Sequence, residues 1–224
     1  MHHDKDILYH FIIVFMCWNF EASLLTGIFS YSIAAYMWLR NTGNDRWQSI
    51  ILFTFSSIQW TDAIIWYLER KKELQSPLTY NIMHYVIPFI IALEPISSLY
   101  GAYYMGNSID KTDIFFYSII CLYFFHIFST GASQNNHIIT QEGIAYSQVE
   151  HNYTSYWIFF LLLIYPILKY TNFATYYAGI SLLNGLLLFI AQQKAPAIGS
   201  KWCLYANLTA ILFLFAPYII PILQ

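Results

Sequence analysis

Long apolar runs alternate with short polar links along the whole chain. No Asp, Glu, Lys or Arg occurs within residues 22–39, 114–127, 152–168, 170–193 or 202–224. Several of these runs reach the roughly 20 residues that an α-helix needs to cross a bilayer. Lipid offers no hydrogen-bond partner to an irregular backbone, so each run is expected to be helical. The pattern predicts an all-α, polytopic membrane protein.

The polar links divide the chain into about seven transmembrane helices in a single bundle. Spans are expected at about 20–39, 48–68, 79–105, 113–129, 155–169, 173–192 and 202–222. They form one seven-helix transmembrane domain, residues 16–224, after an N-terminal extension at residues 1–15. The extension shows no small-residue cleavage site, so no removable signal peptide is expected. The links are short except for a long polar loop at residues 130–154.

Composition agrees with a lipid environment. The chain is 58% hydrophobic, 20% aromatic and only 10% charged, whereas soluble domains average about 45–50% apolar and about 25% charged residues. A net charge of −2 is too small to indicate a nucleic-acid partner. We therefore expect an integral, multi-pass location with the lipid bilayer as partner, and a homo-oligomer remains open.

Orientation in the membrane also remains open. The Lys and Arg residues nearly balance between the two sides, although they slightly favour an inside N-terminus. The long loop has no Lys or Arg and leads into a potential glycosylation sequon at Asn152, which favours the outside. In either orientation, odd-numbered spans start and even-numbered spans end at the same side, which we call the first face.

Two acidic residues fall within the predicted spans. An ionised side chain in the bilayer centre costs at least about 2.5–3.5 kcal/mol, so such residues are candidate functional sites. Asp62 is surrounded in sequence by isoleucines and a tryptophan, and Glu94 precedes Pro95, which removes a backbone donor from its helix. We expect both carboxylates to face the bundle interior and to bind a ligand.

Three further polar residues extend this candidate ligand-binding group. Gln59 is three residues from Asp62 and therefore lies on the same helix face. Glu21 and Asn207 are each four residues from a cysteine, Cys17 and Cys203 respectively. Because both cysteines stand where odd-numbered spans start, we expect this group to gather toward the first face.

The two cysteines at the first face allow three interpretations. They could be inert packing residues, a disulfide or redox pair, or ligands that bind a divalent metal such as zinc together with His84. No local metal-binding motif such as Cys-x-x-Cys joins Cys17, Cys203 and His84, so a metal site depends on the helix arrangement. Cys121, in the middle of a predicted span, is interpreted as a small hydrophobic residue.

Common catalytic signatures are absent from the chain. It contains no Walker loop, dinucleotide fingerprint, HExxH or Gly-x-Ser-x-Gly segment. A retinal protein is excluded because the seventh span has no lysine for a Schiff base. The favoured function is binding or translocation of a small polar solute or ion. An intramembrane metal- or thiol-dependent enzyme and a receptor or assembly module are the alternatives, and catalytic residues stay unknown.

Four short segments also occur in a fixed order: MCWN at residues 16–19, QWTDAIIW at 59–66, LEPISSL at 93–99 and SKWC at 200–203. Together they resemble a poorly characterised family of multi-pass membrane proteins from large DNA viruses, protists and bacteria. Its members open with Met-Cys-Trp-Ser/Asn and end with Ser-x-Trp-Cys. The resemblance implies a multi-pass fold and no particular activity. Asp62 and Glu94 stand where the family pattern has Glu and Gln.

Overall fold

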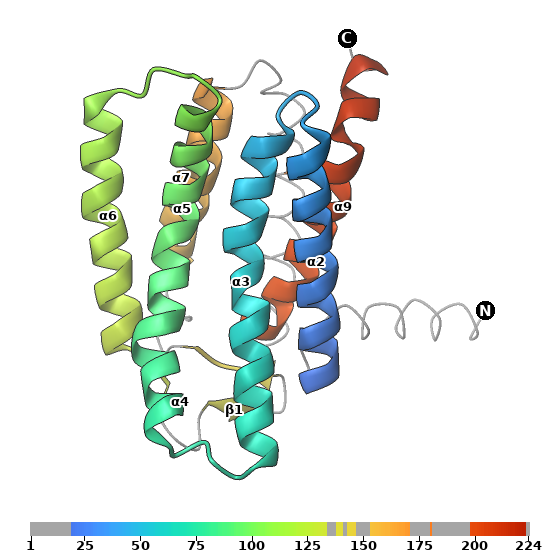
Figure 1. Ribbon diagram of the computed structural model, residues 1–224. Coiled ribbons are helices and arrows are strands. Elements are labelled where there is room, and N and C mark those ends of the chain that lie inside the picture. The colour runs from blue at the N-terminus through green and yellow to red at the C-terminus, as the bar shows by residue number, and fades with distance from the viewer. Residues whose placement is uncertain are drawn as a thin grey trace, which may run out of the picture.

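The computed structural model describes residues 19–133, 138–140, 143–146, 153–170, 180 and 198–222. Long helices lie side by side in this part of the chain (Figure 1). In chain order the elements are α2 (Phe20–Arg40), α3 (Asp45–Arg70), α4 (Pro77–Asn81), the π-helical turn η1 (Ile82–Val86), α5 (Ile87–Tyr104), α6 (Lys111–Thr130), strands β1 (Ile139–Thr140) and β2 (Gly143–Ile144), α7 (Tyr153–Tyr170), α9 (Ile198–Ile219) and the 3-10 turn η4 (Ile220–Ile222). The predicted helical character is confirmed, and the short β1–β2 hairpin is the exception.

The helices follow the predicted spans closely wherever the structure describes them. Six spans have a helical counterpart, with α4, η1 and α5 together forming the third. The predicted span at 173–192 lies outside the described residues, apart from Ile180. Within the described ranges, three helices are long and apolar enough to cross a membrane: Phe20–Arg40, Pro77–Tyr104 and Lys111–Thr130.

Local sequence explains where several helices begin and end. Asn19 caps α2, since its side-chain oxygen accepts a hydrogen bond from the Ala22 backbone N–H at 2.8 Å. Asn41 ends α2 in the left-handed conformation, with a φ of 52° that asparagine tolerates well. Ser76 caps α4, and Pro77 occupies the first helical position, where no backbone donor is needed.

The π-helical turn η1 lies just before a proline. Pro88 has no N–H and therefore cannot bond to the carbonyl of His84 one turn earlier. Residues Ile82–Val86 widen into a π-turn at this place, and such turns are frequent at functional sites. The α4–η1–α5 segment is thus a continuous helix with a local irregularity at His84.

The outer surface of the bundle carries many large hydrophobic residues, and several polar residues lie inside among the hydrophobic core clusters. Large hydrophobic residues project from the outer surface, as on α6, where Phe115 is 62% and Leu122 is 69% exposed. In Figure 1, α6 lies at one edge of the bundle. Polar residues are instead buried, including Asp62 and Glu94, which are 0% and 1% exposed. An apolar exterior around a polar interior suits a helix bundle in lipid.

Helix α3 occupies the centre of the bundle and packs against α2, α5 and α9. Its approach to α5 is close, because a Cβ atom placed on Gly101 would lie 2.2 Å from Cδ1 of Trp47. The contact at Gly27 on α2 is less severe, because a Cβ atom placed there would lie 3.3 Å from Cε2 of Trp60. Small residues therefore allow the helices around α3 to pack tightly.

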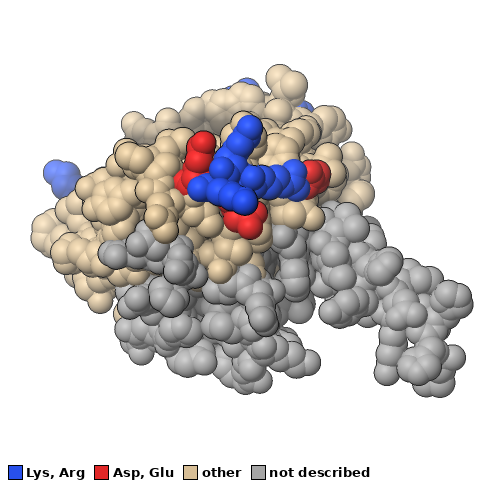
Figure 2. Space-filling model, turned by 90° about the horizontal axis from the view of Figure 1, so that it is seen from below, with Lys and Arg blue, Asp and Glu red and all other residues tan. Residues whose placement is uncertain are grey.

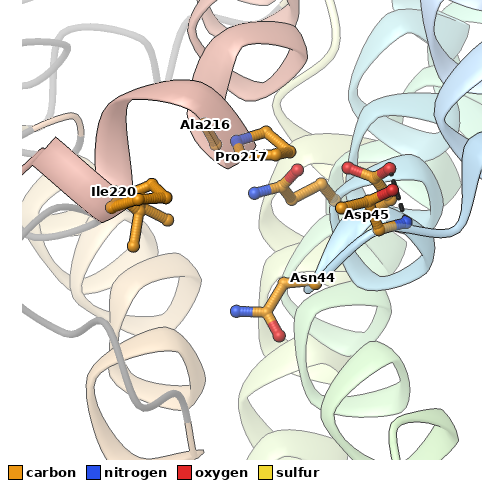
Figure 3. A pocket seen from close by; sticks show the side chains of 9 residues that line it. Asn44, Asp45, Ala216, Pro217 and Ile220 are labelled. Carbon is orange, nitrogen blue, oxygen red and sulfur yellow. Dashed lines mark hydrogen bonds between the residues drawn. The ribbon is translucent and has the colours of Figure 1, made fainter.

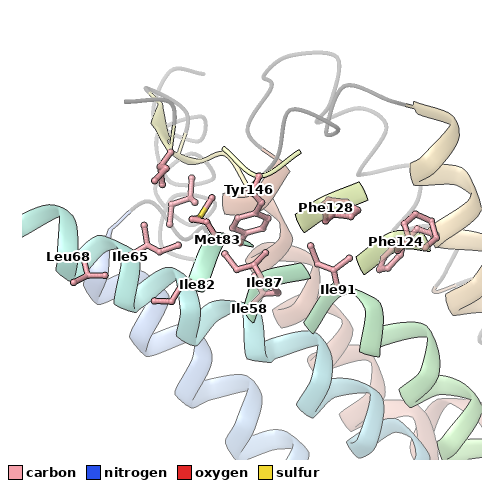
Figure 4. Packing of buried hydrophobic residues seen from close by; sticks show 14 residues of the cluster. Ile58, Ile65, Leu68, Ile82, Met83, Ile87, Ile91, Phe124, Phe128 and Tyr146 are labelled. Atoms are coloured by element: carbon pink, nitrogen blue, oxygen red, sulfur yellow. The ribbon is translucent and has the colours of Figure 1, made fainter. Parts of the chain in front are cut away.

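The described part of the long polar loop 130–154 packs against the bundle at the first face. Strands β1 and β2 pair antiparallel, with Ile139 opposite Ile144. Ile144 and Tyr146 are 0% and 6% exposed and belong to the hydrophobic cluster at this end. Figure 4 shows Tyr146 lying over Met83 and Ile87. The loop can pack against this hydrophobic cluster because it carries apolar residues among its polar ones.

Candidate functional site

Buried polar residues from three helices meet inside the bundle. They are Ser30 on α2, Gln59 and Asp62 on α3, and Cys203 and Asn207 on α9. We call these five residues the polar seam. Each is at most 1% exposed. Helical spacing explains why they share one surface, because Gln59 and Asp62 are three apart and Cys203 and Asn207 are four apart.

Direct hydrogen bonds connect the helices across the polar seam. The Ser30 hydroxyl donates to Oδ1 of Asn207 at 2.7 Å. Nε2 of Gln59 donates to the backbone carbonyl of Cys203 at 3.3 Å. These bonds tie α2 and α3 to α9, and polar side chains commonly join helices in this way within membranes.

Asp62 is contacted by a residue that the sequence analysis did not select. The hydroxyl of Tyr146, from the loop, donates to Oδ1 of Asp62 at 2.7 Å. The short apolar segment Gly143–Tyr146 within a polar loop was the available sequence signal. The loop therefore reaches from the first face to the buried carboxylate.

The expected proximity of Asp62 and Cys203 is present. Oδ2 of Asp62 lies 3.5 Å from Sγ of Cys203. Cys203 is disulfide-bonded, so its sulfur has no proton to donate, and we interpret this contact as a close approach. A disulfide sulfur is also not a thiolate, the form in which cysteine binds zinc. Cys17 lies outside the described residues.

Some hydrogen-bonding capacity in the polar seam is not used within the described part of the chain. Oε1 of Gln59 and Nδ2 of Asn207 are buried and form no hydrogen bond there. The first atom is an acceptor and the second carries two donor hydrogens. Leaving such a buried group unpaired costs about 1–3 kcal/mol. Within the described residues, the polar seam therefore keeps one acceptor and one donor group with which a polar molecule could form hydrogen bonds.

Glu94 occupies a buried position on α5, the neighbour of α3. Its carboxylate lies in the interior as expected, with 1% of the residue exposed. Its backbone carbonyl accepts a hydrogen bond from the Ser97 hydroxyl at 2.7 Å. Ser98 on the same helix donates to the Leu163 carbonyl of α7 at 3.2 Å. Glu94 thus belongs to a second polar region, on the side of α3 that faces α5.

Glu21 lies on the surface of the first face and is separate from the polar seam. Its carboxylate forms a two-pronged ion pair with Arg70, in which the Nη1–Oε1 distance is 2.7 Å. Its side chain is 58% exposed. Figure 2, viewed from this end, shows the basic residues gathered with acidic residues around them. Lys71 and Lys72 follow Arg70 in the same exposed turn.

His84 also lies toward the first face, where its ring contacts the helix end of α6. Its Nδ1 is 2.9 Å from the carbonyl oxygen of Ser129, and its ring stacks on Tyr80 with centroids 4.1 Å apart. Among the residues that the structure describes, no three His, Cys, Asp or Glu side chains are placed to hold a metal ion. The described contacts of His84 and Cys203 do not bring these two residues together.

A buried ion pair between Arg40 and Asp45 lies at the opposite end of the bundle, which we call the second face. Arg40 donates two hydrogen bonds of 2.7 Å to Asp45, which is fully buried. Arg40 also donates to the Leu214 carbonyl at 2.9 Å and so links α2 to α9. A cavity of about 160 Å³ lies beside Asp45. Figure 3 shows Asn44 and Asp45 on one side of it and Ala216, Pro217 and Ile220 on the other.

Comparisons with models of protein families, with curated proteins and with solved structures found no match to this chain. The resemblance to the multi-pass family therefore stays a prediction.

Proposed function

We propose that the chain is a multi-pass integral membrane protein of about seven transmembrane helices whose polar seam binds or translocates a small polar solute or ion. The apolar exterior and buried polar interior support the membrane part of this proposal. Three helices have the length and apolar composition to cross a membrane, and α3, α7 and α9 lie alongside them in the bundle (Figure 1). This arrangement supports several crossings.

The chemistry of the polar seam is the observation that supports binding or translocation of a small polar solute or ion. Asp62 supplies a carboxylate, and Gln59 and Asn207 supply an acceptor and a donor that have no hydrogen bond to the described residues, all within one buried layer. The two hydrogen bonds that join the helices use only part of this capacity, and the remaining buried groups lack partners among the described residues, which is costly unless a ligand supplies them. A cation, a proton or a small neutral polar molecule satisfies this combination of groups.

Flux into proteoliposomes tests the proposal. The purified chain is reconstituted, and uptake of protons is followed with an entrapped pH-sensitive dye while osmotic swelling reports small neutral solutes such as urea. Asp62→Asn is expected to lower cation or proton flux at least about tenfold, and Asn207→Leu to lower neutral-solute flux. The two variants separate the charged from the neutral substrate class.

Glu73→Gln provides the matched control, because this acid is exposed at the first face and should not affect flux. Rates equal to those of empty liposomes for the unmodified protein, or unchanged rates in both variants, would remove the proposal. Labelling of engineered cysteines with a membrane-impermeant maleimide tests the crossings. Positions 43 and 107 should react from one side and position 75 from the other.

A further inference from the structure

A second cavity, separate from the polar seam, opens at the first face between α4, η1 and the long loop. Its volume is about 210 Å³. Leu74, Met83 and Ile138 form its apolar walls. A small organic molecule can therefore fit with much of its surface buried.

His84 supplies the most distinctive polar group of this cavity. A carbonyl oxygen can only accept, so the 2.9 Å contact with Ser129 requires that Nδ1 of His84 carry the proton. In the neutral ring, Nε2 is then a hydrogen-bond acceptor. Nε2 forms no hydrogen bond with the described residues, and His84 lines the cavity.

The ring of His84 is held in place by several features. Tyr80 stacks on one of its faces at 4.1 Å with an interplanar angle of 25°. The Ser129 carbonyl fixes the ring from α6, and the π-turn η1 sets its backbone position. A ring that cannot rotate presents a preorganised acceptor, which lowers the entropy cost of binding.

Ser133 adds a second polar group to the same wall. Its hydroxyl lines the cavity and can donate or accept a hydrogen bond. Its backbone N–H, by contrast, is committed to the Tyr146 carbonyl at 3.0 Å. Thr79 and Ser76, also at the cavity, have hydroxyls occupied by local capping bonds.

We propose that this cavity is a binding site for a compact, neutral molecule that carries a hydrogen-bond donor and an acceptor on a largely apolar frame, such as an azole ring. The donor group of the bound molecule donates a hydrogen bond to Nε2 of His84, and its acceptor group accepts one from the Ser133 hydroxyl. The frame packs against Leu74, Met83 and Ile138. This site does not depend on the polar seam or on solute passage.

A pair of matched probes tests the assignment on the unmodified protein. Imidazole has the required N–H donor, whereas 1-methylimidazole has nearly the same shape and lacks it. Binding of each to the purified full chain in detergent micelles is titrated by saturation-transfer NMR at pH 8, where free imidazole is mainly neutral. We expect saturable binding of imidazole and about two- to tenfold weaker binding of 1-methylimidazole, the effect of one hydrogen bond of about 0.5–1.5 kcal/mol.

Variants then locate the site. His84→Phe keeps a flat ring without the acceptor and should abolish the preference for imidazole. His126→Phe is the matched control, because His126 lies exposed on α6, and it should leave binding unchanged. Equal binding of the two probes to the unmodified protein, or no saturable binding of imidazole beyond that of empty micelles, would overturn the proposal. A folded His84→Phe protein that still prefers imidazole would overturn the assignment to this cavity, and equal unfolding midpoints of this variant and the unmodified protein show that it is folded.

Discussion

Removal of a single hydroxyl, in Tyr146→Phe, tests whether the long loop is anchored to the buried carboxylate. The hydroxyl donates to Oδ1 of Asp62 at 2.7 Å, and the two residues are 6% and 0% exposed. Phenylalanine keeps the ring and therefore the packing in the first-face cluster. The substitution thus isolates one hydrogen bond.

The expected size of the effect follows from the burial of both partners. A hydrogen bond to a charged group contributes about 1.5–3 kcal/mol to stability, and little of this bond is screened by solvent. Tyr146→Phe is therefore expected to lower the free energy of unfolding by about 1.5–3 kcal/mol. In an Asp62→Asn background the acceptor is uncharged, and the same change should cost only about 0.5–1.5 kcal/mol.

Two measurements report this effect at different scales. Equilibrium unfolding in mixed detergent micelles gives the global loss. Hydrogen exchange at the Ala145 amide, which bonds to the Ile138 carbonyl at 2.8 Å, reports opening of the loop itself. Tyr103→Phe is the matched control, because Tyr103 is 64% exposed and its change should stay within about 0.5 kcal/mol. A Tyr146→Phe protein as stable as the control, with unchanged Ala145 exchange, would refute the anchoring.

Three further outcomes are expected. Gly101→Ala should lose about 2 kcal/mol in micelle unfolding, because overpacking against Trp47 costs about 3 kcal/mol and the better helix propensity of alanine offsets about 1 kcal/mol. In Gly27→Ala the new Cβ would lie 3.3 Å from the Trp60 ring, a tight contact that needs only a small shift, so the helix propensity should offset it and the change should be near neutral. Equal losses in the two variants would contradict the close approach at Gly101. Asp45→Asn should cost about 3 kcal/mol by the same measurement because it breaks a buried ion pair, so a loss below about 1 would argue against it. Mass spectrometry of an unreduced digest should find Cys17 joined to Cys203, because Cys203 is disulfide-bonded and the other described cysteine is a free thiol; a free thiol at Cys17 would exclude this pairing.

The helices were largely predictable because their signals are local. The lengths of apolar runs, the charged links and the caps at Asn19 and Ser76 all lie within a few residues of the ends they define. Burial of Asp62 and Glu94 also followed from a local argument, the cost of placing a carboxylate in hydrocarbon. The π-turn at His84 was missed, although Pro88 was a signal for it.

The partners of the polar residues could not be predicted in the same way. Tyr146 and Asp62 are 84 residues apart in sequence, and Ser30 and Asn207 are 177 apart. Glu21 was expected with the interior group, yet it pairs with Arg70 on the surface, because a rotation of the helix start by a fraction of a turn is enough to move a side chain outward. The partner and the orientation of each of these side chains depend on how whole helices pack.

By itself, the sequence determined where the described part of the chain is helical and that Asp62 and Glu94 are buried, since both follow from the cost of exposing polar backbone or charge to lipid. Only the tertiary structure decided that a loop tyrosine reaches Asp62, that α9 joins α2 and α3 through hydrogen bonds, and that a cavity opens beside His84. These features arise from contacts between distant segments, whose geometry is set by packing of the complete bundle.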